Sequence, residues 1–179
     1  KLLLPTLGEM YGQVLESGQL RLTYAQGAFR LRYYERLFPL TPASYAALLL
    51  EAASGLSGEA REEVTSLAYR AEQLSGAGEN YGRESRLLER HLQRLAEQPD
   101  ILSALQAAAE RLDASELDAL LRRQHYRLSD WRLAAEQINY RRFFDVNDLA
   151  ALRMEDPRVF EWAHTKLFEL VRDGLITGV

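Results

Sequence analysis

The stretch "TPASYAALLLEAASGLSGEAREEVTSLAYRAEQLSG", residues 41–76, indicates the class of fold, because its apolar residues repeat at helical spacing. Thr41 and Pro42 are typical of an N-cap and the first position of a helix. The apolar stripe that follows consists of Tyr45, Leu48, Leu49 and Ala52. The segment from Gly55 to Gly58 breaks this helix. A second stripe then runs through Val64, Leu67, Ala68, Ala71 and Leu74. The stretch therefore predicts two consecutive amphipathic helices.

The same pattern continues toward residue 123. Two more stripes consist of Leu87, Leu88, Leu92 and Leu95, and, after Pro99, of Ile101, Leu102, Leu105, Ala109 and Leu112. Ser115 and Asp118 resemble a capping box at the start of a short fifth helix. Residues 75–78, Ser-Gly-Ala-Gly, predict a flexible connection, and no strand precedes these glycines as a phosphate loop would need. We interpret residues 41–124 as a helical subdomain with solvated Glu/Arg faces.

The N-terminal segment, residues 1–40, carries the signal for a small β-hairpin. Residues 19–24 and 28–34 alternate apolar and polar side chains on either side of Gln26-Gly27. The fold class expected from the whole sequence is therefore mainly α with a small β-hairpin.

Composition excludes several classes of function. The 179 residues include no cysteine, which excludes disulfides, thiol nucleophiles and thiolate metal sites and is compatible with a cytoplasmic protein. The net charge of −4 argues against nucleic acid or an anionic membrane as partner, and no apolar run is long enough for a membrane span. His91 and His164 are expected to be packing residues, and no histidine pair has the spacing of metal ligands. We expect no metal and no cofactor.

The C-terminal segment, residues 157–179, has the pattern of a helix that leads into a strand. Asp156 and Pro157 predict its start and Gly174 its end. Its inward face should consist of Val159, Phe160, Ala163, Leu167, Leu170 and Val171. The residues 175–179, Leu-Ile-Thr-Gly-Val, are typical of a buried parallel strand, so this segment predicts an αβ unit. The strand-like run at the end suggests a piece of a longer protein.

Between these parts, the segment 125–156 follows neither a helical nor a strand period, and we expect residues 126–156 to be largely irregular. Its centre, "QINYRRFFDVNDLAALRMEDP" at 137–157, concentrates arginine, aromatic, amide and carboxylate side chains. One interpretation is a structural loop held by Arg–Asp pairs. The other is a ligand site, for a sugar that stacks on aromatic rings and bonds polar groups, or for nucleic acid at the basic segment 121–142. The candidate binding residues are His125, Tyr126, Arg127, Trp131, Asn139, Tyr140, Arg142, Phe143, Phe144, Asp145 and Asn147.

The motif "QHYRLSDWRLAAEQINYRRFFDVNDLAALRMEDPRVFEWAH" closely resembles the maltooligosyltrehalose synthase family, which belongs to the α-amylase-type retaining glycoside-hydrolase superfamily. The opening stretch "KLLLPTLGEMYGQVLESGQLRLTY" and the later stretch "FRLRYYERLFPLTPASY" also look like that family, whereas residues 55–115 are less distinctive. The resemblance implies a (β/α)8 barrel with a long insertion after its third strand. It also implies that residues 157–179 form the third barrel helix and the start of the fourth strand, and that the segment 125–156 forms a wall of the active site.

The resemblance implies an isomerase of trehalose biosynthesis, a branch of carbohydrate metabolism. The complete enzyme would convert the reducing-end α-1,4 bond of a maltooligosaccharide into an α,α-1,1 bond by intramolecular transglucosylation. The family's nucleophile lies in a Gly-x-Arg-x-Asp motif. Gly178 and Val179 match its first two positions, so the nucleophile is expected just after Val179. We therefore expect that this chain contains no catalytic residue. We therefore expect the 179-residue chain to be inactive alone.

The partners implied are the maltooligosaccharide, the remainder of the same polypeptide and, functionally, a maltooligosyltrehalose trehalohydrolase. Two other readings stay open: a stand-alone helical scaffold or adaptor domain, and a nucleic-acid-binding module that uses residues 121–142. Sugar binding, a protein partner or salt-sensitive nucleic-acid binding would separate the three.

Overall fold

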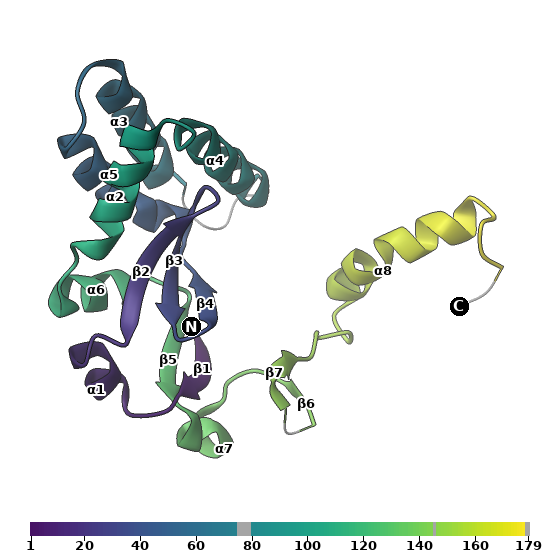
Figure 1. Cartoon of the computed structure of the whole chain (residues 1–179). Coiled ribbons are helices and arrows are strands. Elements are labelled where there is room, and N and C mark those ends of the chain that lie inside the picture. Colours follow the sequence, from purple (N-terminus) through teal and green to yellow (C-terminus); the bar gives the residue numbers. More distant parts are fainter. Residues whose placement is uncertain (75–79, 145, 178–179) are drawn as a thin grey trace.

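The helical subdomain forms the upper part of the computed structural model, which describes residues 1–74, 80–144 and 146–177 (Figure 1). Its helices are α2 (Tyr45–Ser54), α3 (Gly58–Glu72), α4 (Tyr81–Leu95), α5 (Pro99–Glu110) and α6 (Ala114–Leu121). The stripes expected from the sequence are buried, except for four half-buried leucines: Leu74, Leu102 and Leu112, which pack against the core, and Leu87. The predicted mainly α character is confirmed. Residues 75–78, expected to be a flexible connection, lie outside the described residues.

The predicted hairpin is also confirmed, and a third strand extends it. β2 (Leu20–Ala25) pairs antiparallel with β3 (Ala28–Tyr33), and β3 pairs with β4 (Arg36–Pro39), which the sequence pattern did not indicate. Gln26 and Gly27 have φ angles of 52° and 77°. Positive φ at both central residues is the geometry that a two-residue hairpin favours, because its twist matches that of the strands.

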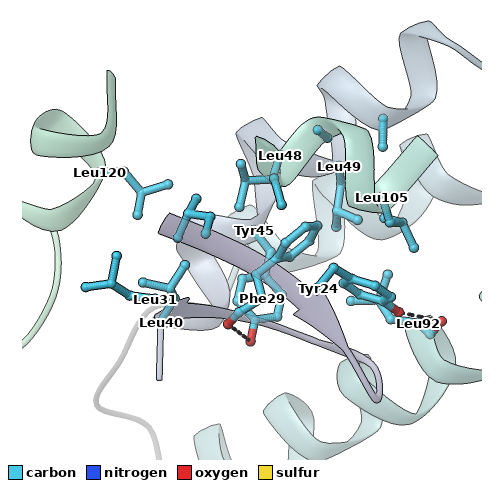
Figure 2. Packing of buried hydrophobic residues seen from close by; sticks show 14 of the residues in the cluster. Tyr24, Phe29, Leu31, Leu40, Tyr45, Leu48, Leu49, Leu92, Leu105 and Leu120 are labelled. Atoms are coloured by element: carbon cyan, nitrogen blue, oxygen red, sulfur yellow. Dashed lines mark hydrogen bonds between the residues drawn. The ribbon is translucent and has the colours of Figure 1, made fainter. Parts of the chain in front are cut away.

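The core lies between one face of this sheet and the helices (Figure 2). The ring of Phe29 packs edge-on against Tyr24 at 5.0 Å and against Tyr45 at 5.2 Å, measured between ring centroids. The hydroxyl of Tyr24 donates a hydrogen bond to the backbone oxygen of Leu92 at 3.0 Å. Sheet, α2 and α4 therefore share one continuous apolar core.

A parallel strand pair corrects the expectation that residues 126–156 are largely irregular. β1 (Leu2–Leu7) pairs with β5 (Tyr126–Asp130), and the backbone N–H of Leu2 donates to the oxygen of His125 at 2.9 Å. A short 3₁₀ turn, η2 (Trp131–Leu133), and the short helix α7 (Ala134–Gln137) follow β5. The sequence missed β5 because five residues show too little periodicity and the partner strand lies more than a hundred residues away. The short helix α1 (Tyr11–Glu16) was missed as well.

The start of α6 also differs from the expectation. The capping box uses Asp113 and Glu116: the backbone N–H of Glu116 donates to the Asp113 carboxylate at 2.9 Å, and the N–H of Asp113 donates to the Glu116 carboxylate at 3.1 Å. The predicted pair, Ser115 and Asp118, lies inside the helix. The start of α2 is preceded by a 3₁₀ turn, η1 (Pro42–Ser44), in which the Thr41 hydroxyl meets the Ser44 hydroxyl at 2.7 Å and caps no backbone N–H.

The part of the chain that follows α7 extends away from this body (Figure 1). β6 (Arg142–Phe143) pairs antiparallel with β7 (Val146–Ala150), and α8 (Pro157–Arg172) follows. The predicted caps of α8 are confirmed: the Asp156 carboxylate accepts from the N–H of Arg158 at 3.0 Å, and Gly174 adopts a φ of 70° after the last turn.

The face of α8 that was expected to point inward is not covered in this chain, because no residue of the helix is buried. Its apolar residues remain partly exposed, and Trp162 is 73% exposed. Residues 175–177 form no strand, and Gly178 and Val179 lie outside the described residues. Within the described part of the chain, no helix combines the length and apolar character needed to cross a membrane.

Candidate functional site

The binding residues expected from the sequence lie in separate places. Tyr126 and Arg127 line a cavity beside β5, His125 lines a hollow on the helical subdomain, and Phe143 and Phe144 lie on the β6–β7 hairpin. The structure therefore places Tyr126 and Arg127 at the cavity, and Arg142, Phe143, Phe144 and the backbone of Asn147 on the hairpin. The predicted residues that the structure describes do not gather at one site.

The cavity beside β5 has a volume of about 540 Å³, within the range of small-molecule sites. It lies between α1, the end of α6 and the start of β5. It is lined by Lys1, Tyr11, Asp118, Leu121, Arg122, Tyr126, Arg127 and Leu128. The mixture of cationic, carboxylate, phenolic and leucine side chains suits a polar ligand with apolar faces.

A hydrogen-bond network forms one wall of this cavity. Tyr11 donates from its hydroxyl to Oδ1 of Asp118 at 2.8 Å, and Arg122 donates from Nε to Oδ2 at 2.7 Å. The hydrogen bonds from Arg122 and then Tyr11 lower the pKa of Asp118. Burial, followed by the bond to Asp118, raises the pKa of Tyr11. The carboxylate therefore stays ionised at neutral pH and acts as an acceptor rather than a general acid.

The hydroxyl of Tyr126 is the second notable group of the cavity. It is buried and has no hydrogen-bond partner among the described residues. Burial raises the pKa of this phenol, so it is a neutral donor at physiological pH. Its ring lies 6.0 Å from that of Phe38, which holds it from the sheet side. A buried hydroxyl without a hydrogen-bond partner is costly for the folded state.

The segment after β5 contains one residue whose predicted role changes. Asn139 donates from Nδ2 to the backbone oxygen of Lys1 at 2.7 Å and accepts from the N–H of Leu3 at 2.9 Å. Its amide thus continues the strand pairing along the edge of β1, which is a structural function. Trp131 is 54% exposed, and the guanidinium of Arg132 lies 5.0 Å from its ring centroid.

The aromatic residues of the hairpin are exposed. Phe143 and Phe144 contact edge-to-face at 4.6 Å between centroids, and Phe144 is 81% exposed with a φ of 53°. Tyr140 and Arg142 each interact with another residue. Asp145 lies outside the described residues, as does the side chain of Asn147, whose backbone belongs to β7.

Sequence reasoning missed Lys1, Tyr11, Asp118 and Arg122 as cavity residues. The four-residue spacing of Asp118, on α6, and Arg122, directly after α6, was a visible signal for an ion pair. No local pattern connects them with Tyr11, which lies 107 residues earlier in the chain. Among the described residues, no group of three or more histidine or acidic side chains could hold a metal ion.

Two proteins of known name share the resemblance seen in the residues. No family model matches the sequence. Two proteins named putative maltooligosyl trehalose synthase, from Mycobacterium tuberculosis strains CDC 1551 / Oshkosh and ATCC 25618 / H37Rv, are each 46% identical over 57 residues, 32% of this chain. The match covers 7% of each relative's length. A solved glycosyltrehalose synthase is similar with a TM-score of 0.45 and 20% identity, covering 93% of this chain and 15% of that chain. The two sequence relatives confirm the resemblance to maltooligosyl trehalose synthases.

Proposed function

We propose that this chain is part of an enzyme that converts the reducing-end α-1,4 bond of a maltooligosaccharide into an α,α-1,1 bond. The observation that carries the proposal is the 46% identity over 57 residues with proteins named putative maltooligosyl trehalose synthase. In the proposed reaction, a carboxylate outside this chain attacks the terminal bond and forms a glycosyl-enzyme. The freed glucose is retained, turns over, and attacks through its anomeric hydroxyl.

Retention of glucose sets a physical demand on the walls of the site. A glucose that escapes lets water resolve the glycosyl-enzyme, so hydrolysis competes with isomerisation. Hydroxyl partners and aromatic faces oppose that escape. The Tyr126 hydroxyl, the ionised Asp118 and the exposed Phe143–Phe144 pair are groups of this kind. We assign them, with Tyr140 and Asn147, to sugar binding in the complete enzyme.

A product assay on the full-length protein tests the reaction. Incubation with maltopentaose should remove reducing ends without releasing an equal amount of glucose, and proton NMR should show the α,α-1,1 anomeric signal. The 179-residue chain alone should give no product above background. Release of glucose alone by the full-length protein, or any trehalose-type product from the isolated chain, would contradict the proposal.

Variants of the full-length enzyme test the assignment of residues. Tyr140→Ala or Asn147→Ala should raise the ratio of free glucose to trehalose-type product. The loss of one buried sugar hydrogen bond costs on the order of 1–3 kcal/mol, about tenfold or more in rate. Tyr126→Phe removes only the unpaired hydroxyl and should act in the same direction. Unchanged product ratios in all of these variants would identify residues 125–147 as a structural segment.

A further inference from the structure

The helical subdomain contains a second hollow that the proposed reaction does not use. It lies between η1 and the first half of α2, the end of α3, the start of α4 and the segment that follows α6, and its volume is about 430 Å³. Part of its lining consists of small side chains, those of Ala43, Ala46, Ala47 and Ala68. Small side chains leave room above the helix backbones, so this surface is recessed between larger neighbours.

Two tyrosines flank this hollow. Tyr69, near the end of α3, is 58% exposed although it is a large aromatic residue. Tyr81, the first residue of α4, also lines the hollow and is half-buried. Aromatic rings with an apolar face and a polar hydroxyl suit ligands that are themselves partly apolar and partly hydroxylated.

The polar groups around the hollow are of both signs. Glu72 supplies an acceptor, Arg123 supplies donors, and His125 supplies one of each in its neutral form. Within the described part of the chain, these three side chains have no hydrogen bond or ion pair with another residue, and all three are exposed. A phosphate would be repelled by the carboxylate of Glu72, and a cation would be repelled by the guanidinium of Arg123. A neutral ligand rich in hydroxyl groups satisfies both.

We propose that this hollow is a binding subsite for a neutral sugar chain, held by Tyr69 and Tyr81 and oriented by Glu72, Arg123 and His125. The identity of the sugar as an α-1,4-glucan rests on the proposed function. The subsite would hold a length of the glucan on the helical subdomain. Longer chains would then bind the protein more tightly than short ones, because a second contact raises the effective concentration of the first.

Electrophoretic retardation of the full-length protein in native gels containing soluble amylose measures this binding. Tyr69→Ala should weaken amylose binding by about three- to tenfold, the range expected from the loss of one aromatic contact. Tyr69→Phe keeps the ring and should bind as the wild type does. Tyr34→Ala, which removes an exposed tyrosine after β3, is the matched control and should leave retardation unchanged. Glu72→Gln, at an exposed position, should weaken binding without loss of fold if Tyr69→Ala proves unstable.

Two results would overturn the subsite: wild-type retardation in both Tyr69→Ala and Glu72→Gln, or equal weakening in Tyr34→Ala. The product assay on the wild type separates this proposal from the reaction. A protein that isomerises maltopentaose while both variants bind amylose normally would refute only the subsite. A protein whose amylose binding depends on Tyr69 but that forms no α,α-1,1 product would refute only the reaction.

Discussion

The phenol of Tyr24 joins the sheet to α4 through its hydrogen bond to the Leu92 oxygen, inside the apolar core. Tyr24→Phe removes this bond and leaves the carbonyl without that donor. We expect a loss of about 1–2 kcal/mol in the free energy of unfolding, measured by urea denaturation. Tyr34→Phe, whose hydroxyl bonds Gln19 at the exposed surface, should cost less because water replaces the lost partner. Equal costs would contradict the role assigned to the buried bond.

The same phenol predicts how stability depends on alkaline pH. Burial raises the pKa of Tyr24 from 10.0 to about 12. The folded state therefore holds this proton more tightly than the unfolded chain does. The contribution of the protonated phenol to the free energy of unfolding is fully present below pH 10. As pH rises from 10 to about 12, the unfolded chain ionises first and stability falls. In urea denaturation between pH 9 and 12, the free energy of unfolding should decline less steeply in Tyr24→Phe than in the wild type. Equal slopes in the two proteins would contradict this role of Tyr24.

Residues differ in how much of their environment the local sequence determines. Leu49 and Val64 are predicted to be buried by helical spacing alone, and both are fully buried. Tyr126 has no such pattern, because its burial comes from Phe38 and from its position in β5. Asn139 likewise resembled a ligand-binding amide until its partners on the β1 backbone were known. The role of a polar residue in a non-periodic segment depends on its hydrogen-bond partner in the fold, and the local sequence does not reveal that partner.

The turn of the β2–β3 hairpin is an element that packs through its backbone. A Cβ at Gly27 would lie 2.2 Å from the backbone oxygen of Glu89 on α4, and the φ angle of 77° strains any L side chain. Gly27→Ala should therefore lower the free energy of unfolding by about 2 kcal/mol or more. Gly18→Ala is the matched control, because Gly18 also has a positive φ but an open surrounding. Gly18→Ala should lower the free energy of unfolding only by the backbone strain, about 1 kcal/mol. A smaller loss in Gly27→Ala than in the control would show that the hairpin does not rest on α4.

The start of α6 gives a second prediction for an element. Asp113→Ala removes the N-cap side chain and should cost about 1 kcal/mol in thermal or urea unfolding. Ser115→Ala changes the residue that the sequence pattern favoured and should have almost no effect, since that position lies within the helix. The box was misplaced by two residues because Ser-x-x-Asp and Asp-x-x-Glu overlap here. Capping side chains identify the existence of a helix end better than its position.

At the scale of the whole molecule, the sequence predicted the helical body and the hairpin because their contacts are mostly local in the chain. It missed the β1–β5 pair, which joins the two ends of this body, and with it the cavity formed by Tyr11, Asp118 and Tyr126. The predicted binding residues of the segment 125–147 are distributed over β5, η2 and the β6–β7 hairpin, because the segment forms several short elements in different places. The expected barrel unit in residues 157–179 stays a prediction.

The separation of α8 from the body gives the last prediction. This helix of 16 residues buries none of its side chains in the chain described, although it is amphipathic and well capped. An isolated helix of this length is marginal in water, and most helices gain their stability from a packed apolar face. In hydrogen-exchange mass spectrometry of the 179-residue chain, peptides from α8 should exchange within seconds to minutes, while those from α2 should be protected for far longer. In a full-length protein, α8 should become protected, because its face of Phe160, Leu167 and Val171 would gain a partner. Equal protection of α8 and α2 in the isolated chain would show instead that α8 is stable without that partner.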